Sequence, residues 1–318
     1  MMIDIMGDPH LGRRFLNDVP LDRRGEREEM VWADFEKGLQ VSWDTKCHVM
    51  LGDIFDKVDV GFETVVRAAD IYLTAAFKHT STKFILLGGN HDQRRDGFRG
   101  PFDALKLMLA GVDNIACVDA DHPYTFGEAV FFSWHPSVPA SELVGKISGT
   151  PEMAFGHWDV EDYGDSNLPN LIPTKALAER GITKAVTGHV HTADRFDRDG
   201  LEVVVHGSLQ PFSFAEDPEK RFYTTLSLEE FDNTDPAEFK MKCVRVLLPD
   251  GAEAPPPPDC LQFKVIKADT MAPDGAELDV DMAQVFSTTR TLEEVLTEKE
   301  VAPHVAQRIR ERILEDAE

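Results

Sequence analysis

Aspartate, asparagine and histidine residues follow five short apolar runs of this chain, and runs of this kind form buried strands. Most of these polar residues adjoin a glycine, which allows the main chain to turn sharply where a strand ends. Mixed carboxylate, imidazole and amide groups suit divalent ions such as manganese, iron or zinc. The residues concerned are Asp8, His10, Asp53, Asn90, His91, His157, His189 and His191.

This set holds more ligands than one ion needs, but it suits two ions that share a carboxylate. Two metal ions about 3.5–4 Å apart can activate a water molecule and hold a phosphoryl group between them. The residue types and their positions therefore predict a two-metal site for phosphoester chemistry.

The other histidines have no comparable setting. A lone histidine is more often a surface or core residue than a metal ligand. For His135, which precedes a proline, both a structural role and a metal role stay open. His206 follows a predicted strand and could line the site without being a ligand. Structural roles are expected for His48, His79, His122 and His304.

The elements that must position these residues alternate between strand and helix in the first part of the chain. Alternation of this size indicates parallel strands joined by helices, and ligands bind at the carboxyl ends of such strands. The predicted strands are 2–6, 47–51 and 84–87, and the predicted helices are 26–43 and 62–78.

Further along, the pattern changes to strands with less helix between them. The last two predicted strands, 202–205 and 222–228, indicate an antiparallel continuation. We therefore predict an α/β fold in which two sheets form a sandwich flanked by helices. The other elements of this part are helices at 102–109 and 174–180 and strands at 130–134, at 153–157 and from residue 184.

The composition shifts near residue 240. Four consecutive prolines at 255–258 indicate an extended spacer between strand candidates at 243–248 and 261–266. After residue 292, apolar residues recur at helical spacing, with a break at Pro303. The sequence thus predicts three regions: a catalytic domain over 1–240, a small region over 241–285 and a helical tail over 286–318.

The overall composition is typical of a soluble globular protein, with 42% hydrophobic and 28% charged residues. No apolar run approaches the roughly 20 residues that cross a bilayer, and the amino terminus lacks the regions of a cleavable signal. Four scattered cysteines show no paired metal spacing and fit a reducing compartment. We therefore expect a cytoplasmic protein with no membrane partner.

The formal net charge of −24 argues against a nucleic-acid partner, because such proteins usually show a basic surface. Several arginines nevertheless follow the predicted metal loops, where they could contact a substrate phosphate. A solvated surface is the alternative for each of them. The candidates are Arg13, Arg14, Arg94 and Arg95.

The motifs around the predicted ligands resemble, in order and spacing, those of the calcineurin-like metallophosphoesterases. These motifs are residues 7–10, 52–56, 89–92, 156–157 and 188–191. Within that superfamily, the chain resembles the SbcD-type DNA-repair and recombination nucleases of bacteria and bacteriophages. The narrower resemblance depends on the short loop at 52–56 and on residues 207–214, which run on to 220–222.

This resemblance implies a role for each residue of the site. His91 would not bind metal but would face the scissile phosphate and help the leaving oxygen depart, and Asp56 would orient His91. Asp53 would bridge the two ions. One ion would be held by Asp8, His10 and His191, and the other by Asn90, His157 and His189.

The resemblance also implies a function and partners. The protein would be the DNA exo- and endonuclease subunit of an SbcCD-like complex, with hydrolysis by a metal-bound hydroxide. Mn²⁺ would be the preferred metal, with Mg²⁺, Fe²⁺ or Zn²⁺ as alternatives. Residues 241–285 would form a reduced cap, and residues 286–318 would bind an SbcC-type ATPase within a homodimer. A phage-encoded protein would act in the host cytoplasm.

Two other functions stay open at this point. A small-molecule phosphodiesterase or phosphatase of the same fold would suit the acidic surface. A non-catalytic scaffold of this fold would bind partners only, but such scaffolds typically lose the ligands that this chain keeps.

Overall fold

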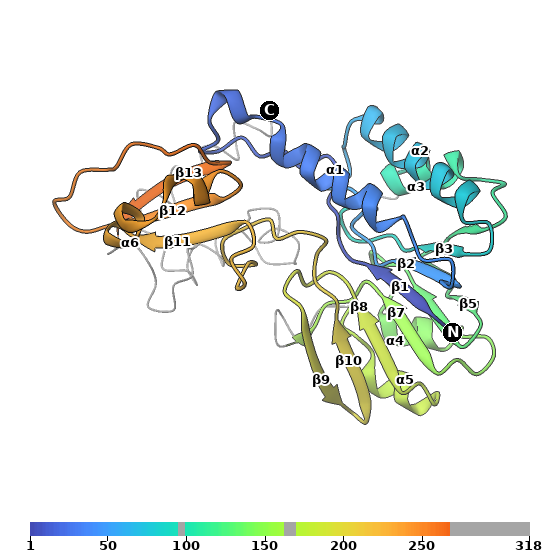
Figure 1. The fold of residues 1–318 in the computed structure, drawn as a ribbon. Helices are drawn as coiled ribbons and strands as arrows, with labels where there is room; N and C mark the ends of the chain where they lie inside the picture. The colour runs from blue at the N-terminus through green and yellow to red at the C-terminus, as the bar shows by residue number, and fades with distance from the viewer. Residues whose placement is uncertain (95–98, 162–169, 268–318) are drawn as a thin grey trace, which may run out of the picture. The chain divides into compact units, whose positions relative to one another are not determined.

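Parallel strands form the first sheet, in the order β1-β2-β3-β4 (Figure 1). The computed structural model describes residues 1–94, 99–161 and 170–267. The strands are β1 (Ile3–Met6), β2 (Cys47–Met50), β3 (Lys83–Leu86) and β4 (Ile115–Cys117). The helices between them are α1 (Glu26–Gly38), α2 (Phe62–Lys78) and α3 (Pro101–Met108).

The second sheet is mixed, in the order β5-β6-β7-β8-β10-β9. Its four inner strands run parallel, and an antiparallel strand closes each edge. The strands are β5 (Tyr124–Phe126), β6 (Ala129–Phe132), β7 (Met153–Gly156), β8 (Lys184–Thr187), β9 (Asp194–Arg198) and β10 (Leu201–Val205). Helices α4 (Ala140–Val144) and α5 (Thr174–Glu179) pack on this sheet.

Successive side chains along each strand point to opposite faces of the sheet, and this divides the core into layers. Val49 of β2 and Ile85 of β3 belong to the apolar cluster shared by both sheets, together with Phe131 and Phe155, whose rings stack at 5.2 Å. Met50 instead belongs to the cluster under α1 and α2. Because both faces of the first sheet are covered, its central strands are mostly apolar, and the exception in β2 is the buried His48. The predicted α/β sandwich flanked by helices is confirmed.

Helix α2 matches its predicted bounds of 62–78 because its apolar residues recur at helical spacing and face the core. Helix α1 ends at Gly38, earlier than the predicted residue 43. Glycine is a poor helix former, and here a Cβ atom would lie 2.2 Å from the Cε atom of Met6. The glycine therefore serves close packing against β1.

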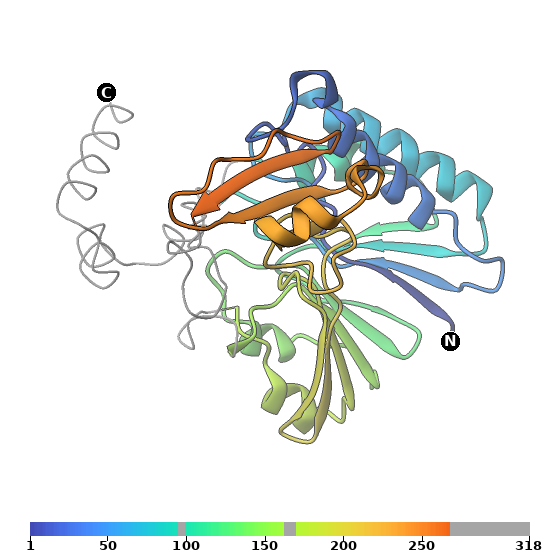
Figure 2. The ribbon, with the colours of Figure 1, turned by 60° about the vertical axis from the view of Figure 1, so that its left-hand side comes forward.

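A third sheet of three parallel strands follows the sandwich (Figure 2). It contains β11 (Tyr223–Ser227), β12 (Cys243–Leu248) and β13 (Gln262–Lys267), with α6 (Leu228–Asn233) and a 3₁₀ turn at Pro236–Phe239 after β11. The predicted antiparallel continuation at 222–228 is wrong, because β11 pairs in parallel with β12. The antiparallel partner of β10 is β9.

Contacts with the first part of the chain hold the third sheet. Arg23, in a 3₁₀ turn at Leu21–Arg23 before α1, donates a hydrogen bond of 2.5 Å to Asp259. The main-chain N–H of Phe263 in β13 donates to the carbonyl of Asp18 at 2.9 Å. These contacts place β13 beside the segment that leads into α1, as Figure 2 shows.

The third sheet extends across residue 240, since β11 precedes this residue and β12 follows it. The division into 1–240, 241–285 and 286–318 stays a prediction. Arg95, residues 268–285 of the expected cap and the whole expected tail lie outside the described residues. Within the described ranges, the structure has no helix that is both long and apolar enough to cross a membrane.

Candidate metal centre

The predicted ligands lie where strands of both sheets end. Asp8 and His10 follow β1, Asp53 follows β2, and Asn90 follows β3. In the second sheet, His157 follows β7, and His189 and His191 follow β8. Parallel strands present their carboxyl ends at one edge, so residues 181 positions apart, such as His10 and His191, meet there.

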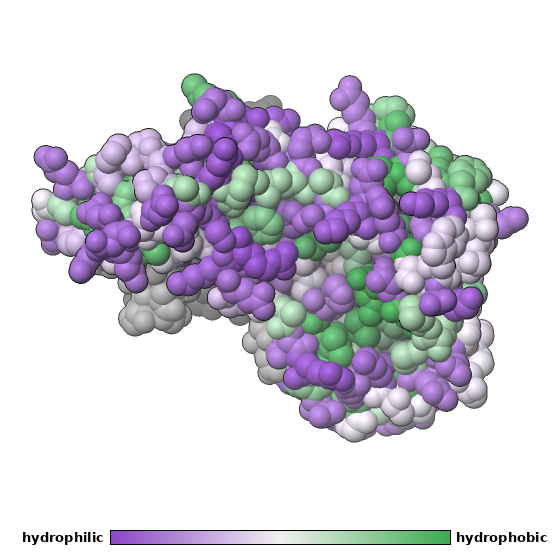
Figure 3. Space-filling model, in the orientation of Figure 1, coloured by the Kyte–Doolittle hydropathy of each residue, from purple (hydrophilic) through white to green (hydrophobic). Residues whose placement is uncertain are grey.

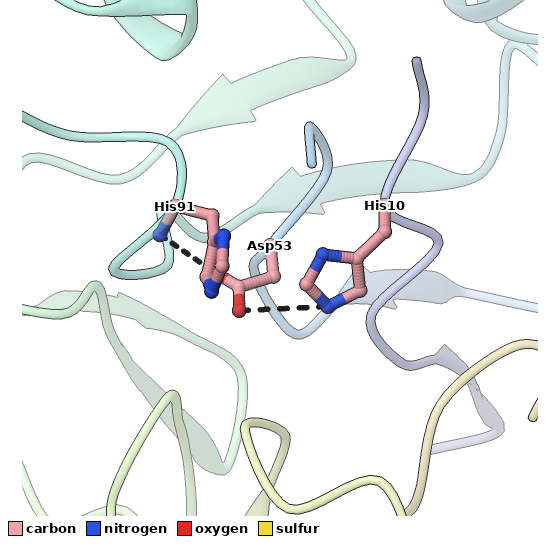
Figure 4. A group of neighbouring side chains, drawn as sticks. All are labelled: His10, Asp53 and His91. Carbon is pink, nitrogen blue, oxygen red and sulfur yellow. Dashed lines mark hydrogen bonds and ion pairs between the residues drawn. The ribbon is translucent and has the colours of Figure 1, made fainter. Parts of the chain in front are cut away.

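Asp53 joins two groups of potential ligands. The first group is His10, Asp53 and His91, and the second is Asp53, His157 and His189; in each, one ligand atom per residue lies within 4.8 Å of the others. Figure 4 shows the Asp53 carboxylate between His10 and His91. One oxygen, Oδ2, lies 3.7 Å from His10 Nε2, and the other, Oδ1, lies 3.4 Å from His157 Nε2. This is the geometry that a bridging carboxylate needs.

His191 and Asp8 border the first group. His191 Nε2 lies 3.0 Å from His10 Nε2. Asp8 accepts the main-chain N–H of His189 through Oδ2 at 2.8 Å, whereas its buried Oδ1 accepts no hydrogen bond from the described residues. A fully buried carboxylate oxygen without a donor is costly unless a cation is present.

The second group contains three electron-pair donors that face one another. His157 donates Nδ1–H to the carbonyl of Leu51 at 2.9 Å, and His189 Nε2 lies 2.7 Å from Asp159 Oδ1. With these hydrogens assigned from their partners, the opposite ring nitrogens carry lone pairs. Both of these nitrogens face Asn90 Oδ1: His157 Nε2 lies 3.0 Å from it, and His189 Nδ1 lies 2.9 Å from it.

Burial and neighbouring charges set the electrostatics of the centre. Burial raises the pKa of Asp8 well above its ordinary value, and the charge of Asp53 adds to the shift. Burial also raises the pKa of Asp53, but His157, His91 and His10 outweigh it, so that pKa lies well below the usual range. Burial holds the pKa of His10 well below normal. A buried carboxylate surrounded by imidazole nitrogens fits divalent cations, and we conclude that the donor set suits them.

The ligand loops have unusual main-chain conformations. His10, Asp53 and His189 have φ angles of +45°, +46° and +73°, in the left-handed region that non-glycine residues rarely adopt. Each such residue costs about 1–3 kcal/mol and persists where the surrounding structure holds it. Gly89 must be glycine, because a Cβ atom there would lie 2.1 Å from Asp53 Oδ1. The loops therefore bring the main chain directly against the ligands.

His91 lies beside Asp53 at the edge of the centre. Its main-chain N–H donates to Asp53 Oδ1 at 2.9 Å, and its Nδ1 lies 2.6 Å from the main-chain oxygen of Asp56. The sequence predicts that the Asp56 carboxylate orients this ring, and in the structure the main-chain oxygen of Asp56 makes the contact with Nδ1. The carboxylate lies 3.8 Å from His10 Nδ1 and 3.5 Å from an Arg13 nitrogen.

The candidate arginines are distributed unequally around the centre. Arg13 is one-third exposed, pairs with Asp56 and lies over the ring of Phe212 at 5.0 Å. Arg14 is 72% exposed and lies 3.5 Å from Glu28 of α1. Arg94 is half-buried, just after the loop that carries His91. Through Asp56 and Phe212, Arg13 is connected to the surroundings of the predicted ligands.

Three acidic residues support the ligands without having been assigned from the sequence. Asp159 contacts His189, and Glu216 lies 3.2 Å from His191 Nδ1. The buried carboxylate of Asp92 accepts the main-chain N–H groups of Ile54, Phe55 and Gly89, and burial followed by the charge of Asp53 raises its pKa to about 7. Asp92 and Asp159 could have been found from the sequence, because they lie at the end of a predicted ligand motif or just after one. Glu216 lies in no such motif, so the sequence around it does not mark it.

None of the other histidines in the described ranges belongs to either group of potential ligands. His48 is buried with Nδ1 2.7 Å from Asp4, and His135 accepts the N–H groups of Ser137 and Val138. His206 contacts the carbonyl of Gly207. His79 is buried and His122 is exposed, while His304 lies outside the described ranges.

Metal analysis tests the shared role of Asp53. We expect the wild-type protein, loaded with Mn²⁺ and desalted, to retain two equivalents per chain, whereas Asp53→Ala loses both ions because each group lacks its common carboxylate. Asp59→Ala is the matched control, since Asp59 lies on the same loop with an exposed side chain. Wild-type protein that is fully active with one equivalent or less would contradict this expectation, as would Asp53→Ala protein that keeps both ions.

Three comparisons place the chain among known proteins. The crystal structure of phosphopantetheinyl hydrolase (PptH) from Mycobacterium tuberculosis is similar with a TM-score of 0.41 and 12% identity, over 69% of this chain and 92% of that one. A search of curated proteins found no match. The family model for the calcineurin-like phosphoesterases (Metallophos) matches residues 1–207, which is well over half of the chain. The chain therefore belongs to the calcineurin-like phosphoesterase family.

Proposed function

We propose that this phosphoesterase is a two-metal DNA nuclease of the SbcD type. Its family consists of metal-dependent hydrolases that bind two divalent ions. The finer assignment depends on one observation: residues 207–214, whose sequence resembles that of the SbcD nucleases, contact the metal centre. The ring of Phe212 lies edge-on to the rings of His10 and His191, with centroids 5.2 Å and 5.7 Å away.

In this proposal, Asp53 would bridge the two ions. Mixed oxygen and nitrogen donors would suit Mn²⁺, the proposed metal, and also Fe²⁺ or Zn²⁺. The ions, when bound, would activate water and offset the negative charge of the phosphate. The residues that would hold them are Asp8, His10 and His191 for one ion and Asn90, His157 and His189 for the other.

His91 is the proposed proton donor to the leaving oxygen. Its Nδ1 faces the main-chain oxygen of Asp56, which leaves Nε2 to exchange a proton with the substrate. Burial lowers the pKa of His91, but Asp53 and then Asp56 outweigh it and raise that pKa above its ordinary value. The raised pKa shifts the ring toward the protonated form, which an acid catalyst needs.

Arg13 is the proposed contact for the phosphate backbone, since it is partly exposed beside Asp56 and Phe212. We propose Arg14, Arg94 and Arg95 as further contacts. Hydrophilic residues cover much of the face in Figure 3, and the net charge of the chain is −24. We therefore propose that a partner supplies much of the basic surface that holds long DNA.

The proposed partner is an SbcC-type ATPase in the cytoplasm, bound within a complex that contains a homodimer of this chain. Residues 1–240 would be the nuclease domain, 241–285 a reduced cap and 286–318 the ATPase-binding arm. The apolar residues of 286–318 recur at helical spacing, and so short a segment has little core of its own in which to bury them.

Two substrates distinguish a nuclease from a small-molecule enzyme. We expect Mn²⁺-loaded protein to degrade linear DNA with a higher kcat/KM than it shows for a chromogenic phosphodiester, and chelation of the metal should abolish both activities. Efficient turnover of the small diester without DNA cleavage would favour a small-molecule phosphodiesterase instead. The acidic surface makes this second outcome a physical alternative.

Replacement of His91 separates metal binding from chemistry. His91→Ala should retain both ions and lose at least about a hundredfold in DNA cleavage, the usual contribution of a positioned acid or base. His122→Ala is a matched control, because His122 is exposed and lies outside the centre. Because His91 also lies within ligand distance of His10 and Asp53, loss of metal from His91→Ala would identify it as a ligand.

Truncation after residue 285 tests the ATPase-binding arm. The shortened protein should keep its metal content and its cleavage of short DNA, since the described ligands all precede this point. It should no longer co-purify with an SbcC-type ATPase, and ATP-stimulated cutting of long duplexes should disappear. Unfolding or metal loss on truncation would instead assign the segment to the catalytic core.

A further inference from the structure

Two carboxylates contact neighbouring histidines of the centre through opposite ring nitrogens. We propose that Glu216 and Asp159 are positioning residues, each of which controls the affinity of one metal position. Glu216 would orient His191 toward the ion shared with His10, and Asp159 would orient His189 toward the ion shared with Asn90. This inference rests on the proposed assignment of the ligands to two ions.

Glu216 is placed to hold the His191 ring from behind. Its Oε2 lies 3.2 Å from His191 Nδ1, so this nitrogen carries the hydrogen and Nε2 carries the lone pair. That Nε2 lies 3.0 Å from His10 Nε2. The carboxylate thus selects the ring nitrogen that faces the first group of ligands.

Asp159 selects the opposite nitrogen on His189. Asp159 Oδ1 lies 2.7 Å from His189 Nε2, so Nδ1 carries the lone pair and lies 2.9 Å from Asn90 Oδ1. The two histidines are separated in sequence by Val190 alone. Opposite nitrogens therefore allow one short turn to serve both metal positions, provided that each ring is held in its own tautomer.

The loop that carries Glu216 is itself firmly held. Glu216 accepts the main-chain N–H of Phe212 at 2.8 Å and the Ser213 hydroxyl at 3.1 Å. The next residue, buried Asp217, accepts the N–H groups of three successive residues at 221–223, at 2.9, 2.6 and 2.8 Å. The carboxylate is thus anchored to the start of the third sheet, and this rigidity is what a positioning residue requires.

Metal titration of the full-length protein tests the inference. We expect Glu216→Gln to weaken one of two Mn²⁺ affinities by about 10–100-fold and leave the other unchanged, and Asp159→Asn to weaken the other one. Calorimetry measures the two affinities, and electron paramagnetic resonance reports loss of the coupled ion pair. Glu219→Gln is the matched control, since Glu219 is exposed on the same loop.

A double-variant comparison identifies which position each carboxylate serves. In a His191→Ala background, Glu216→Gln should have no further effect on metal affinity, because the ring it positions is absent. The effects of Glu216→Gln and Asp159→Asn should combine independently. If Glu216 merely supported the fold, its replacement would weaken both ions equally, and this result would overturn the inference.

The wild-type protein provides a test that needs no variant. Nitrogen-15 spectra of the metal-free protein should show His191 with its hydrogen on Nδ1 and His189 with its hydrogen on Nε2. The reverse tautomers, or unchanged affinities in both variants, would refute the positioning roles while wild-type protein still bound two ions. Failure of the wild-type protein to bind two ions would refute the proposed function instead.

Discussion

The centre depends on one buried carboxylate, that of Asp53, with histidines on both sides of it. A charge removed from water is tolerated only where hydrogen bonds and opposite charges replace the lost solvation. Here the His91 N–H donates to Oδ1, the imidazoles of His157 and His10 approach the two oxygens, and the residues around them suit cations. Gly89 is needed because any side chain there would occupy the space of this carboxylate.

The packed sandwich stabilises the strained main chain around this carboxylate. Three of the predicted ligands, His10, Asp53 and His189, have left-handed main-chain conformations, which would relax if the surrounding loops were free. Asp92 ties the loops after β2 and β3 through three main-chain N–H groups, and the apolar cluster between the sheets fixes the strands themselves. The strain at the ligands is thus held by packing that takes no direct part in chemistry.

A second link connects the centre to the third sheet. Phe212 and Glu216 contact the ligand histidines, while Asp217 and the Tyr223 hydroxyl, which donates to the Phe212 carbonyl at 3.0 Å, hold the same loop to β11. Buried Arg27 of α1 donates to Gln210 and to the carbonyl of Pro211, so the first helix contributes as well. Residues after the family domain therefore complete the surroundings of the predicted ligands.

The sequence by itself determined the features that repeat over short distances. The helical spacing of α2, the apolar strands and the polar residues directly after them are local patterns, and from them follow the α/β sandwich and the meeting of Asp8, Asp53 and His157 at one edge. The glycines beside Asp8, Asp53, Asn90, His157 and His189 could be read from the sequence for the same reason, although the ligand roles remain proposals.

Only the tertiary structure decided which distant segments touch. Glu216 reaches His191 across 25 positions with no strand end to mark it, and the parallel pairing of β11 with β12 depends on a partner that follows in sequence. The main-chain oxygen of Asp56, rather than a side chain alone, faces His91. Such contacts arise from how loops pack once the sheets have formed, and residue types carry little information about them because any nearby carboxylate or carbonyl satisfies the same hydrogen bond.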